Sequence, residues 1–217
     1  MENTSNAVEY KKLNGYINEG KFQFNLEEQP TISDFQEKIG ETITLVGECL
    51  LNTRDNFPAK KNKRGEEIGS REYYDNTDTY NGKKIDYIEK HELWDDNDNE
   101  WLYCLVYNGR IVKIGMTITS IRARYGSYSC GTARAMEKGS CSTTNYIISE
   151  CNFAALKNGM NVSIYGLKCP KEKKEVIRFG SKRVCCVSVV RELETMLTSR
   201  FLEFYGHLPV LCVQKGK

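Results

Sequence analysis

The stretch WLYCLVYNGRIVKIG, residues 101–115, consists of two apolar, β-prone runs joined by Asn108-Gly109. An Asn-Gly pair between two such runs is the strongest short-range signal for a β-hairpin. Two side chains differ from their aliphatic neighbours, because Tyr103 stands in the first run and Lys113 in the second. We therefore predict a hairpin at the centre of a sheet, with these two residues as candidate functional side chains.

The length of the connecting loop decides whether the two side chains share a face of the sheet. With a two-residue Asn108-Gly109 turn and regular pairing, Tyr103 faces Ile114 and lies on the opposite face from Lys113. With a three-residue loop, residues 107–109, and Gly109 in the left-handed conformation, Tyr103 lies directly across from Lys113. A shared site needs the second register, so we predict the three-residue loop with a glycine bulge.

The chain has 217 residues and a net charge of +2, which hides a strong asymmetry between its halves. Residues 101–217 carry 18 Lys and Arg against seven Glu and no Asp, a net charge of +11, whereas residues 1–100 carry −9. A basic half beside an acidic half is expected when only one half faces a polyanion. Chance distribution over a solvated surface is the alternative.

The acidic half, residues 1–100, reads as an extension with little recognisable chemistry. Apolar residues recur at helical spacing between Ile32 and Leu50, and they predict a helix over about 33–50 with Ser33 as its N-cap. The segment 52–100 is polar, and a second hairpin is expected around Tyr80-Asn81-Gly82-Lys83. The basic run at 60–64 is either a solvated loop or a phosphate contact.

Nine cysteines without CxxC spacing predict buried, reduced thiols rather than a disulfide framework. A zinc site formed by Cys130, Cys141 and Cys151 is the alternative. The sequence shows no apolar run of about 20 residues and no basic-then-apolar N-terminus, so we expect neither a membrane span nor a secretory signal. These features indicate a cytoplasmic protein.

Downstream of the hairpin, helices are predicted over 119–128 and 143–158. On the first of these, helical spacing places Ile121, Arg124 and Tyr128 on one face. Arg122 then points away from that face.

Residues 160–169 alternate in polarity and should return as a third strand of the same sheet. A charged loop at 171–175 and a short strand at 176–179 follow. We therefore expect the α+β class, with a small antiparallel sheet of about three strands flanked by helices. An irregular, partly helical N-terminal extension precedes this domain, which spans residues 101–217.

A final helix is predicted over about 188–205 and ends at Gly206. Its apolar stripe includes Glu194, whereas Glu192 and Glu203 point away. A glutamate on a buried stripe is costly unless it is paired or binds a metal. Glu194 is thus either a metal ligand or an edge residue satisfied by an arginine.

The order of these elements resembles the GIY-YIG nuclease superfamily. Its first motif corresponds to Leu102-Tyr103-Cys104 and its second to Lys113-Ile114-Gly115. The sequence is most similar to the type II restriction-endonuclease branch, in which lysine replaces the second tyrosine. The resemblance covers roughly half the chain and continues through GRIVKIGMTIT, SYSCG at 127–131, GSCSTTNY at 139–146, the RELE helix and the LPVLC tail.

This resemblance implies a role for each candidate residue. Tyr103 or Lys113 would handle the proton of the attacking water, Arg124 would clamp the phosphate, and Glu194 would bind a divalent metal, Mg²⁺ or Mn²⁺. Tyr128 falls where this branch has another site tyrosine. The sequence departs from the family at Met116, where some relatives have a polar residue, and in the tail, where Cys212 and Gln214 stand in place of an expected asparagine.

The function implied is site-specific hydrolysis of double-stranded DNA by a metal-dependent endonuclease. A restriction enzyme of this kind would act as a homodimer and have a cognate methyltransferase as a partner. A mobile-element or defence nuclease of the same family is one alternative, and a DNA-binding module with an inactive nuclease core is another. The intact set of Tyr103, Lys113, Arg124 and Glu194 argues against the inactive module.

Overall fold

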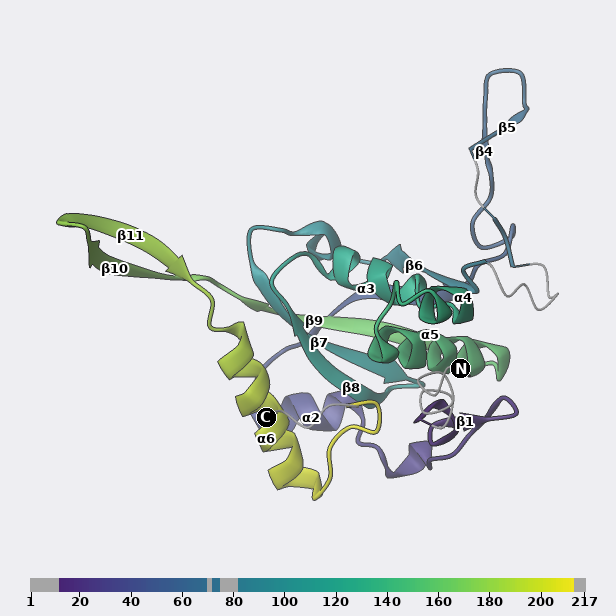
Figure 1. The fold of residues 1–217 in the computed structure, drawn as a ribbon. Coiled ribbons are helices and arrows are strands. Elements are labelled where there is room, and N and C mark those ends of the chain that lie inside the picture. Colours follow the sequence, from purple (N-terminus) through teal and green to yellow (C-terminus); the bar gives the residue numbers. More distant parts are fainter. Residues whose placement is uncertain (1–11, 70–71, 75–81, 213–217) are drawn as a thin grey trace, which may run out of the picture. The chain divides into compact units, whose positions relative to one another are not determined.

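The computed structural model describes residues 12–69, 72–74 and 82–212 (Figure 1). Its helices are the 3-10 turns η1 (Leu26–Glu28) and η2 (Glu92–Asp95) and the α-helices α2 (Ile32–Ile39), α3 (Ile121–Ser129), α4 (Ala133–Glu137), α5 (Thr143–Lys157) and α6 (Val190–Tyr205). Its strands are β1 (Ile17–Asn18), β2 (Lys21–Phe22), β3 (Thr44–Leu51), β4 (Lys60–Lys61), β5 (Glu67–Ile68), β6 (Ile85–Glu89), β7 (Glu100–Tyr107), β8 (Arg110–Thr117), β9 (Val162–Cys169), β10 (Glu172–Arg178) and β11 (Ser181–Val187). None of the helices in these ranges combines the length and apolar character that a membrane span requires.

The fold belongs to the α+β class and contains a five-stranded sheet with the strand order β6-β3-β9-β7-β8. Its three predicted strands, the hairpin β7–β8 and the returning strand β9, are neighbours in this order. The expected number of about three strands is nevertheless too small. The two additional strands, β3 and β6, come from residues before 100, which were expected to stand outside the sheet.

The helix predicted over about 33–50 is wrong in its second half. Helix α2 begins after Thr31, whose side chain accepts a hydrogen bond from the Asp34 amide, so Thr31 rather than Ser33 is the N-cap. The helix stops at Gly40, which has a φ of 70° and donates its N–H to the Gln36 carbonyl. Residues 44–51 form strand β3, where β-branched and apolar residues continue the helical spacing by coincidence.

By compactness the chain divides into two units, each assembled from three segments. Among the described residues, the first unit contains 12–25, those between 48 and 88, and 125–162, and the second contains 26–47, 89–124 and 163–212. The second unit holds β7, β8, most of β9 and the helices α2 and α6. The candidate site is built within this second unit.

One face of the hairpin β7–β8 packs against α2 and α6 in the second unit. The apolar cluster there joins Phe35 of α2 and Phe201 of α6 to Cys104, Val106 and other hairpin residues. The two phenylalanine rings meet edge to face, with 5.3 Å between their centroids. This packing holds α6, and with it Glu194, against the hairpin.

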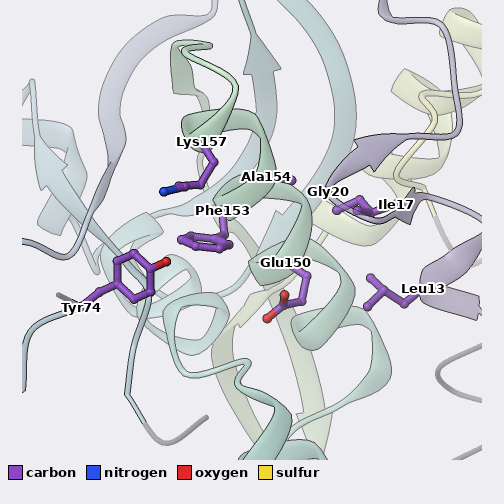
Figure 2. A pocket seen from close by; sticks show the side chains of 8 residues that line it. All are labelled: Leu13, Ile17, Gly20, Tyr74, Glu150, Phe153, Ala154 and Lys157. Atoms are coloured by element: carbon purple, nitrogen blue, oxygen red, sulfur yellow. The ribbon is translucent and has the colours of Figure 1, made fainter. Parts of the chain in front are cut away.

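The first unit is centred on α5, whose N-terminus is capped by Ser142. It contains a cavity of about 350 Å³ with Tyr74, Glu150, Phe153 and Lys157 on its wall (Figure 2). Lys84 forms an ion pair with the half-buried Glu150, with 3.1 Å between nitrogen and oxygen, so the charge of this carboxylate is compensated. We interpret this cavity as a packing feature of the unit.

Several other expectations fall in the described ranges. The helices predicted over 119–128 and 143–158 are confirmed as α3 and α5, and the final helix as α6. The charged loop expected at 171–175 is wrong, because residues 172–175 form the first part of strand β10. Residues 75–81, which include most of the hairpin expected around Tyr80, lie outside the described part of the chain.

Candidate active site

The hairpin β7–β8 turns through Asn108 and Gly109, whose φ angles are 46° and 82°. These values, with Tyr107 paired to Arg110, identify a two-residue turn. The three-residue loop predicted from the sequence is therefore wrong. The pairing begins in the register that would separate Tyr103 from Lys113.

A β-bulge changes this register two residues into the hairpin. Val106 pairs with Ile111, but the next residue of β7, Leu105, pairs with Lys113. Val112 is thus an extra residue on β8, and every later side chain of that strand changes face. The bulge within β8, and not a longer turn, brings Tyr103 and Lys113 to the same face of the hairpin.

As a result of the bulge, Tyr103 pairs with Gly115 and lies on the same face as Lys113, which is two residue pairs further along the ladder. The predicted shared face is confirmed, whereas the predicted direct opposition of Tyr103 and Lys113 is wrong. Gly115 has a steric role in this arrangement. A Cβ atom built on Gly115 would lie 2.5 Å from the Tyr103 hydroxyl oxygen, so only glycine leaves room for the phenol ring.

The C-terminal tail supports the bulge. The Leu211 amide donates a hydrogen bond of 2.8 Å to the carbonyl oxygen of Val112, the extra residue. In return, the Lys113 ammonium donates to the Leu211 carbonyl at 3.5 Å, and Lys113 is buried with 8% of its surface exposed. The bulge that sets the face of Lys113 is therefore held by the segment after α6.

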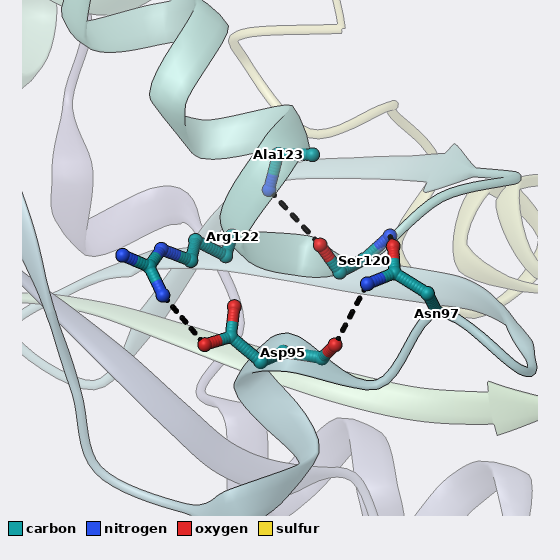
Figure 3. A network of polar contacts seen from close by, with 5 residues as sticks. All are labelled: Asp95, Asn97, Ser120, Arg122 and Ala123. Atoms are coloured by element: carbon teal, nitrogen blue, oxygen red, sulfur yellow. Dashed lines mark hydrogen bonds and ion pairs between the residues drawn. The ribbon is translucent and has the colours of Figure 1, made fainter.

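A network of polar contacts fixes the start of α3, the helix that carries Arg124 (Figure 3). Ser120 caps the helix by accepting the Ala123 amide at 3.2 Å, and its own amide donates to Asn97 Oδ1 at 3.1 Å. Arg122 points outward, as predicted, and forms an ion pair of 2.6 Å with Asp95.

The guanidinium of Arg124 reaches the hairpin. Its Nε–H donates a hydrogen bond of 3.2 Å to the hydroxyl oxygen of Tyr103, which is buried. Arg124 itself is half-buried. Side chains from two of the predicted elements, β7 and α3, therefore meet at the Tyr103 hydroxyl.

Glu194 completes this group from α6. It is half-buried, whereas Glu192 and Glu203 on the same helix are exposed, as predicted. Burial raises the pKa of the Glu194 carboxyl above its usual value, while the cations of Lys113, Arg124 and Arg191 act in the opposite direction.

The Glu194 carboxylate is available for a ligand. It makes no hydrogen bond or ion pair with any other residue in the part of the chain that the structure describes. The edge residue satisfied by an arginine contact, considered from the sequence, is therefore not observed. Lys113 and Arg124 act on this carboxylate only through longer-range electrostatics.

Cys212 is a neighbour of the site that sequence reasoning did not include. Its sulfur lies 3.6 Å from the Ile114 carbonyl oxygen. Burial raises the pKa of the Cys212 thiol, with Lys113 lowering it and Glu194 raising it, so these groups surround the sulfur. The only sequence signal was its place in the tail, where an asparagine was expected from the resemblance.

Tyr128 belongs to the other unit. It is fully buried there, and its ring packs edge to face against Tyr125 with 5.3 Å between centroids. The four residues that meet in the second unit are Tyr103, Lys113, Arg124 and Glu194.

The donor atoms at the site fit one kind of metal. Over the described ranges, no three His, Cys, Asp or Glu side chains come together as a metal-binding group. The zinc site considered for Cys130, Cys141 and Cys151 is therefore not formed. A single half-buried carboxylate fits a hard cation such as Mg²⁺, which keeps several waters and binds protein through one or two carboxylates.

No protein-family model matches the sequence, and no curated protein matches it significantly. Among solved structures, the following two are similar in fold. The restriction endonuclease HPY188I in complex with product DNA is 23% identical, with 88% of this chain and 90% of that chain covered and a TM-score of 0.49. A mutant of bacteriophage T4 EndoII is 16% identical, with 85% and 99% covered and a TM-score of 0.43. Because both scores are low, the functional inference rests on residues of this chain.

Proposed function

We propose that the protein is a divalent-metal-dependent endonuclease that hydrolyses phosphodiester bonds of double-stranded DNA. One observation carries this proposal. Within one unit, the Tyr103 phenol is bonded to Arg124 beside a buried lysine, Lys113, and a half-buried Glu194 that has no direct partner among the described residues. Phosphodiester hydrolysis needs these functions: a base for water, a cation for the phosphate and a ligand for a metal.

Arg124 is the phosphate-binding residue in this proposal. Its planar guanidinium carries several N–H donors, and the Nε–H is committed to the Tyr103 oxygen. In this proposal the same side chain holds the phenol and directs its guanidinium toward a non-bridging phosphate oxygen. A lysine at this position would provide one charge but not two directed bonds.

Tyr103 and Lys113 are the two candidates for proton transfer from the attacking water. They share a face of the hairpin, and the bulge at Val112 places them there. Glu194 would hold the metal, and a bound Mg²⁺ or Mn²⁺ would supply positive charge for the leaving 3′ oxygen. The raised pKa of Glu194 implies that protons compete with the metal more strongly than at an ordinary glutamate.

More specifically, we propose that this endonuclease is a restriction enzyme. The motif resemblance over residues 101–213 supports site-specific cleavage, and a symmetric homodimer would cut both strands of a short site. We further propose a cytoplasmic location, consistent with nine free cysteines, and a cognate methyltransferase as partner. In this proposal the catalytic residues all lie within residues 101–217, whereas strands β3 and β6 of the same sheet come from before residue 100.

Plasmid cleavage in the presence of Mg²⁺ tests the proposal. Glu194→Gln and Tyr103→Phe are expected to reduce the rate by about 10²–10⁴-fold, because each removes a group that acts on the transition state. Glu192→Gln is the matched control, since it removes the same charge from an exposed position on the same helix. DNA binding, measured by electrophoretic mobility shift, should survive in all three variants.

Two results would overturn the assignment. If the wild-type protein binds DNA but cuts none with either Mg²⁺ or Mn²⁺, the protein is a binding module. If Glu194→Gln cuts as fast as Glu192→Gln, the carboxylate has another role. The requirement for a planar fork is tested by Arg124→Lys, which should be nearly inactive, against Arg122→Lys, whose side chain is bound to Asp95.

A further inference from the structure

Strands β10 and β11 form a hairpin, the arm (residues 172–187), that joins β9 to α6. The two strands pair only with each other, in a regular antiparallel register from Glu172–Val187 to Arg178–Ser181. Nearly every arm residue is exposed, and Figure 1 shows the arm projecting from β9 and α6. An isolated two-stranded hairpin is marginally stable in water, so its exposure requires an explanation outside its own packing.

The arm is positively charged, with five Lys and Arg against two Glu. Alternation along the paired strands distributes these residues between two faces. Lys174, Arg178 and Arg183 lie on one face, the cationic face, with Glu172. The opposite face carries Lys173, Glu175 and Lys182 together with the exposed Ile177 and Val184.

Ion pairs neutralise the two faces unequally. On the opposite face, Lys182 pairs with Glu175 at 2.7 Å. On the cationic face, Lys174 lies 3.5 Å from Glu172, but Arg178 and Arg183 have no acidic partner among the described residues. The two arginines are diagonal neighbours in the register, so their guanidinium groups form an uncompensated pair near the tip.

The residue at the first position of the tip turn is unfavourable for its backbone conformation. Phe179 has a φ of 51°, a left-handed conformation that favours glycine or asparagine, and its side chain is fully exposed. A bulky aromatic residue in this conformation is strained and gains no burial in return. Such an outlier motivates a functional explanation.

The base of the arm is fixed close to Glu194. Cys169, before the arm, and Val190, after it, are buried in one cluster with Leu102 of β7. Ser188 donates a hydrogen bond of 2.9 Å to the carboxylate of Glu100, which is buried. The arm is thus anchored where α6 begins, one turn before the proposed metal ligand.

From these observations we infer that the arm binds double-stranded DNA through its cationic face, with Phe179 contacting the duplex at the tip. The inference rests on the proposed function and adds a binding element to it. The major groove accommodates a two-stranded ribbon, and a strand of seven residues reaches about 20 Å. The arm of a second copy is a poorer occupant of this face, because it carries the same positive charge.

Paired substitutions test the cationic face. Arg178→Gln with Arg183→Gln removes two charges from it, and Lys173→Gln with Lys182→Gln removes two charges from the opposite face. Binding to a fluorescein-labelled duplex of mixed sequence is measured by anisotropy at several salt concentrations, with EDTA present so that no cleavage occurs. Circular dichroism verifies that both variants are folded.

We expect the arginine pair to weaken binding about tenfold and to make the slope of log K against log salt shallower by about 1.8. The lysine pair should stay close to the wild type, because charges more than about 10 Å from the phosphates are screened at 0.1 M salt. Equal effects of the two pairs would overturn the face assignment. A changed oligomeric mass with unchanged DNA binding would show that the face binds a second copy instead.

Phe179→Asn separates binding from turn stability. Asparagine suits the left-handed position, so the variant should have a more stable arm. If Phe179 contacts DNA, the same variant binds more weakly despite the better turn. Unchanged binding by this variant would overturn the tip contact.

Two adjacent cysteines provide an internal probe of the faces. Cys185 and Cys186 are both exposed, and alternation places Cys185 on the cationic face and Cys186 on the opposite face. Alkylation with N-ethylmaleimide, read by mass spectrometry, should be slowed by duplex DNA at Cys185 and much less at Cys186. Equal protection of both, or of neither, contradicts the inference.

The outcomes also separate this inference from the proposed function. A wild-type protein that does not bind duplex DNA overturns both. A protein that binds DNA in an arginine-dependent way but never cuts it retains the arm and loses the nuclease assignment. A protein that cuts DNA at the wild-type rate and affinity without the two arginines retains the nuclease and loses the arm.

Discussion

The hairpins β7–β8 and β10–β11 use the same backbone device for opposite purposes. Both have two-residue turns with positive φ at both positions, Asn108-Gly109 in one and Phe179-Gly180 in the other. All eight residues of β7 are buried, whereas almost the whole of β10 is exposed. The buried side chains of β7–β8 stabilise the fold by packing. The exposed side chains of β10–β11 make few contacts within the protein and are accessible to a binding partner.

The two hairpins also differ in regularity. The exposed arm pairs without interruption, but the buried hairpin carries a bulge at Val112 that returns Tyr103 and Lys113 to one face. Bulges often lie next to active sites, where they redirect a side chain. In this protein, the departure from regular pairing lies at the proposed catalytic residues, and the departure from favourable turn chemistry lies at the tip of the arm that we infer to bind DNA.

The largest expected contrast comes from the same substitution in both hairpins. Ile111→Ala in β8 removes a fully buried side chain and should lower the free energy of unfolding by about 2–5 kcal/mol. Ile177→Ala in the arm, where the side chain is 72% exposed, should change it by less than about 0.5 kcal/mol. Urea denaturation measures both values, and comparable losses would refute the claim that the arm contributes little to stability.

Gly115→Ala tests the steric requirement of the site. The added methyl group would overlap the Tyr103 ring, so we expect a loss of about 1–3 kcal/mol in unfolding free energy and nearly complete loss of cleavage. Gly126→Ala in α3 is the matched control, because no atom lies within 4 Å of the added Cβ. Normal cleavage by Gly115→Ala would mean that the Tyr103 position is not needed for catalysis.

Exchanging the first turn residues of the two hairpins, Asn108 and Phe179, should change the stability of each hairpin by a smaller amount and in opposite directions. Asn108→Phe places a bulky residue at a φ of 46° and should destabilise the buried hairpin by about 1 kcal/mol. Phe179→Asn should stabilise the arm by a similar amount, seen as slower amide hydrogen exchange in β10 and β11. Opposite signs are required; the same sign in both hairpins would contradict the strain assigned to Phe179.

The smallest expected effect on stability is that of Glu194→Gln, and it depends on pH. Burial raises the pKa of Glu194 in the folded protein, so this group stabilises the fold below its unfolded pKa and loses that contribution as the pH rises through the folded pKa. The variant should therefore be at least as stable as the wild type at neutral pH, with an advantage that disappears in acid. Denaturation at several pH values, with Glu192→Gln as control, measures this; a variant less stable at neutral pH would contradict it.

Much of the candidate site was predictable because it depends on local patterns. The Asn108-Gly109 signal located the hairpin, and helical periodicity correctly turned Arg124 inward and Arg122 outward. The same periodicity correctly placed Glu194 on the apolar side of α6 and Glu192 on its exposed side. These features follow from residue type and spacing within one element, so a single sequence contains them.

The tertiary structure alone decided the features that depend on distant segments. The bulge at Val112 is held by the Leu211 amide from the far end of the chain, and no local signal in β8 announces it. Residues 44–51 form strand β3 despite their helical spacing, because they pair with β6 and β9 in the five-stranded sheet. The exposure of Phe179 also depends on tertiary structure, because the sequence of a turn does not show whether other segments pack against its side chains. Residue type fixed which chemistry the chain carries, and long-range packing fixed which of those side chains meet.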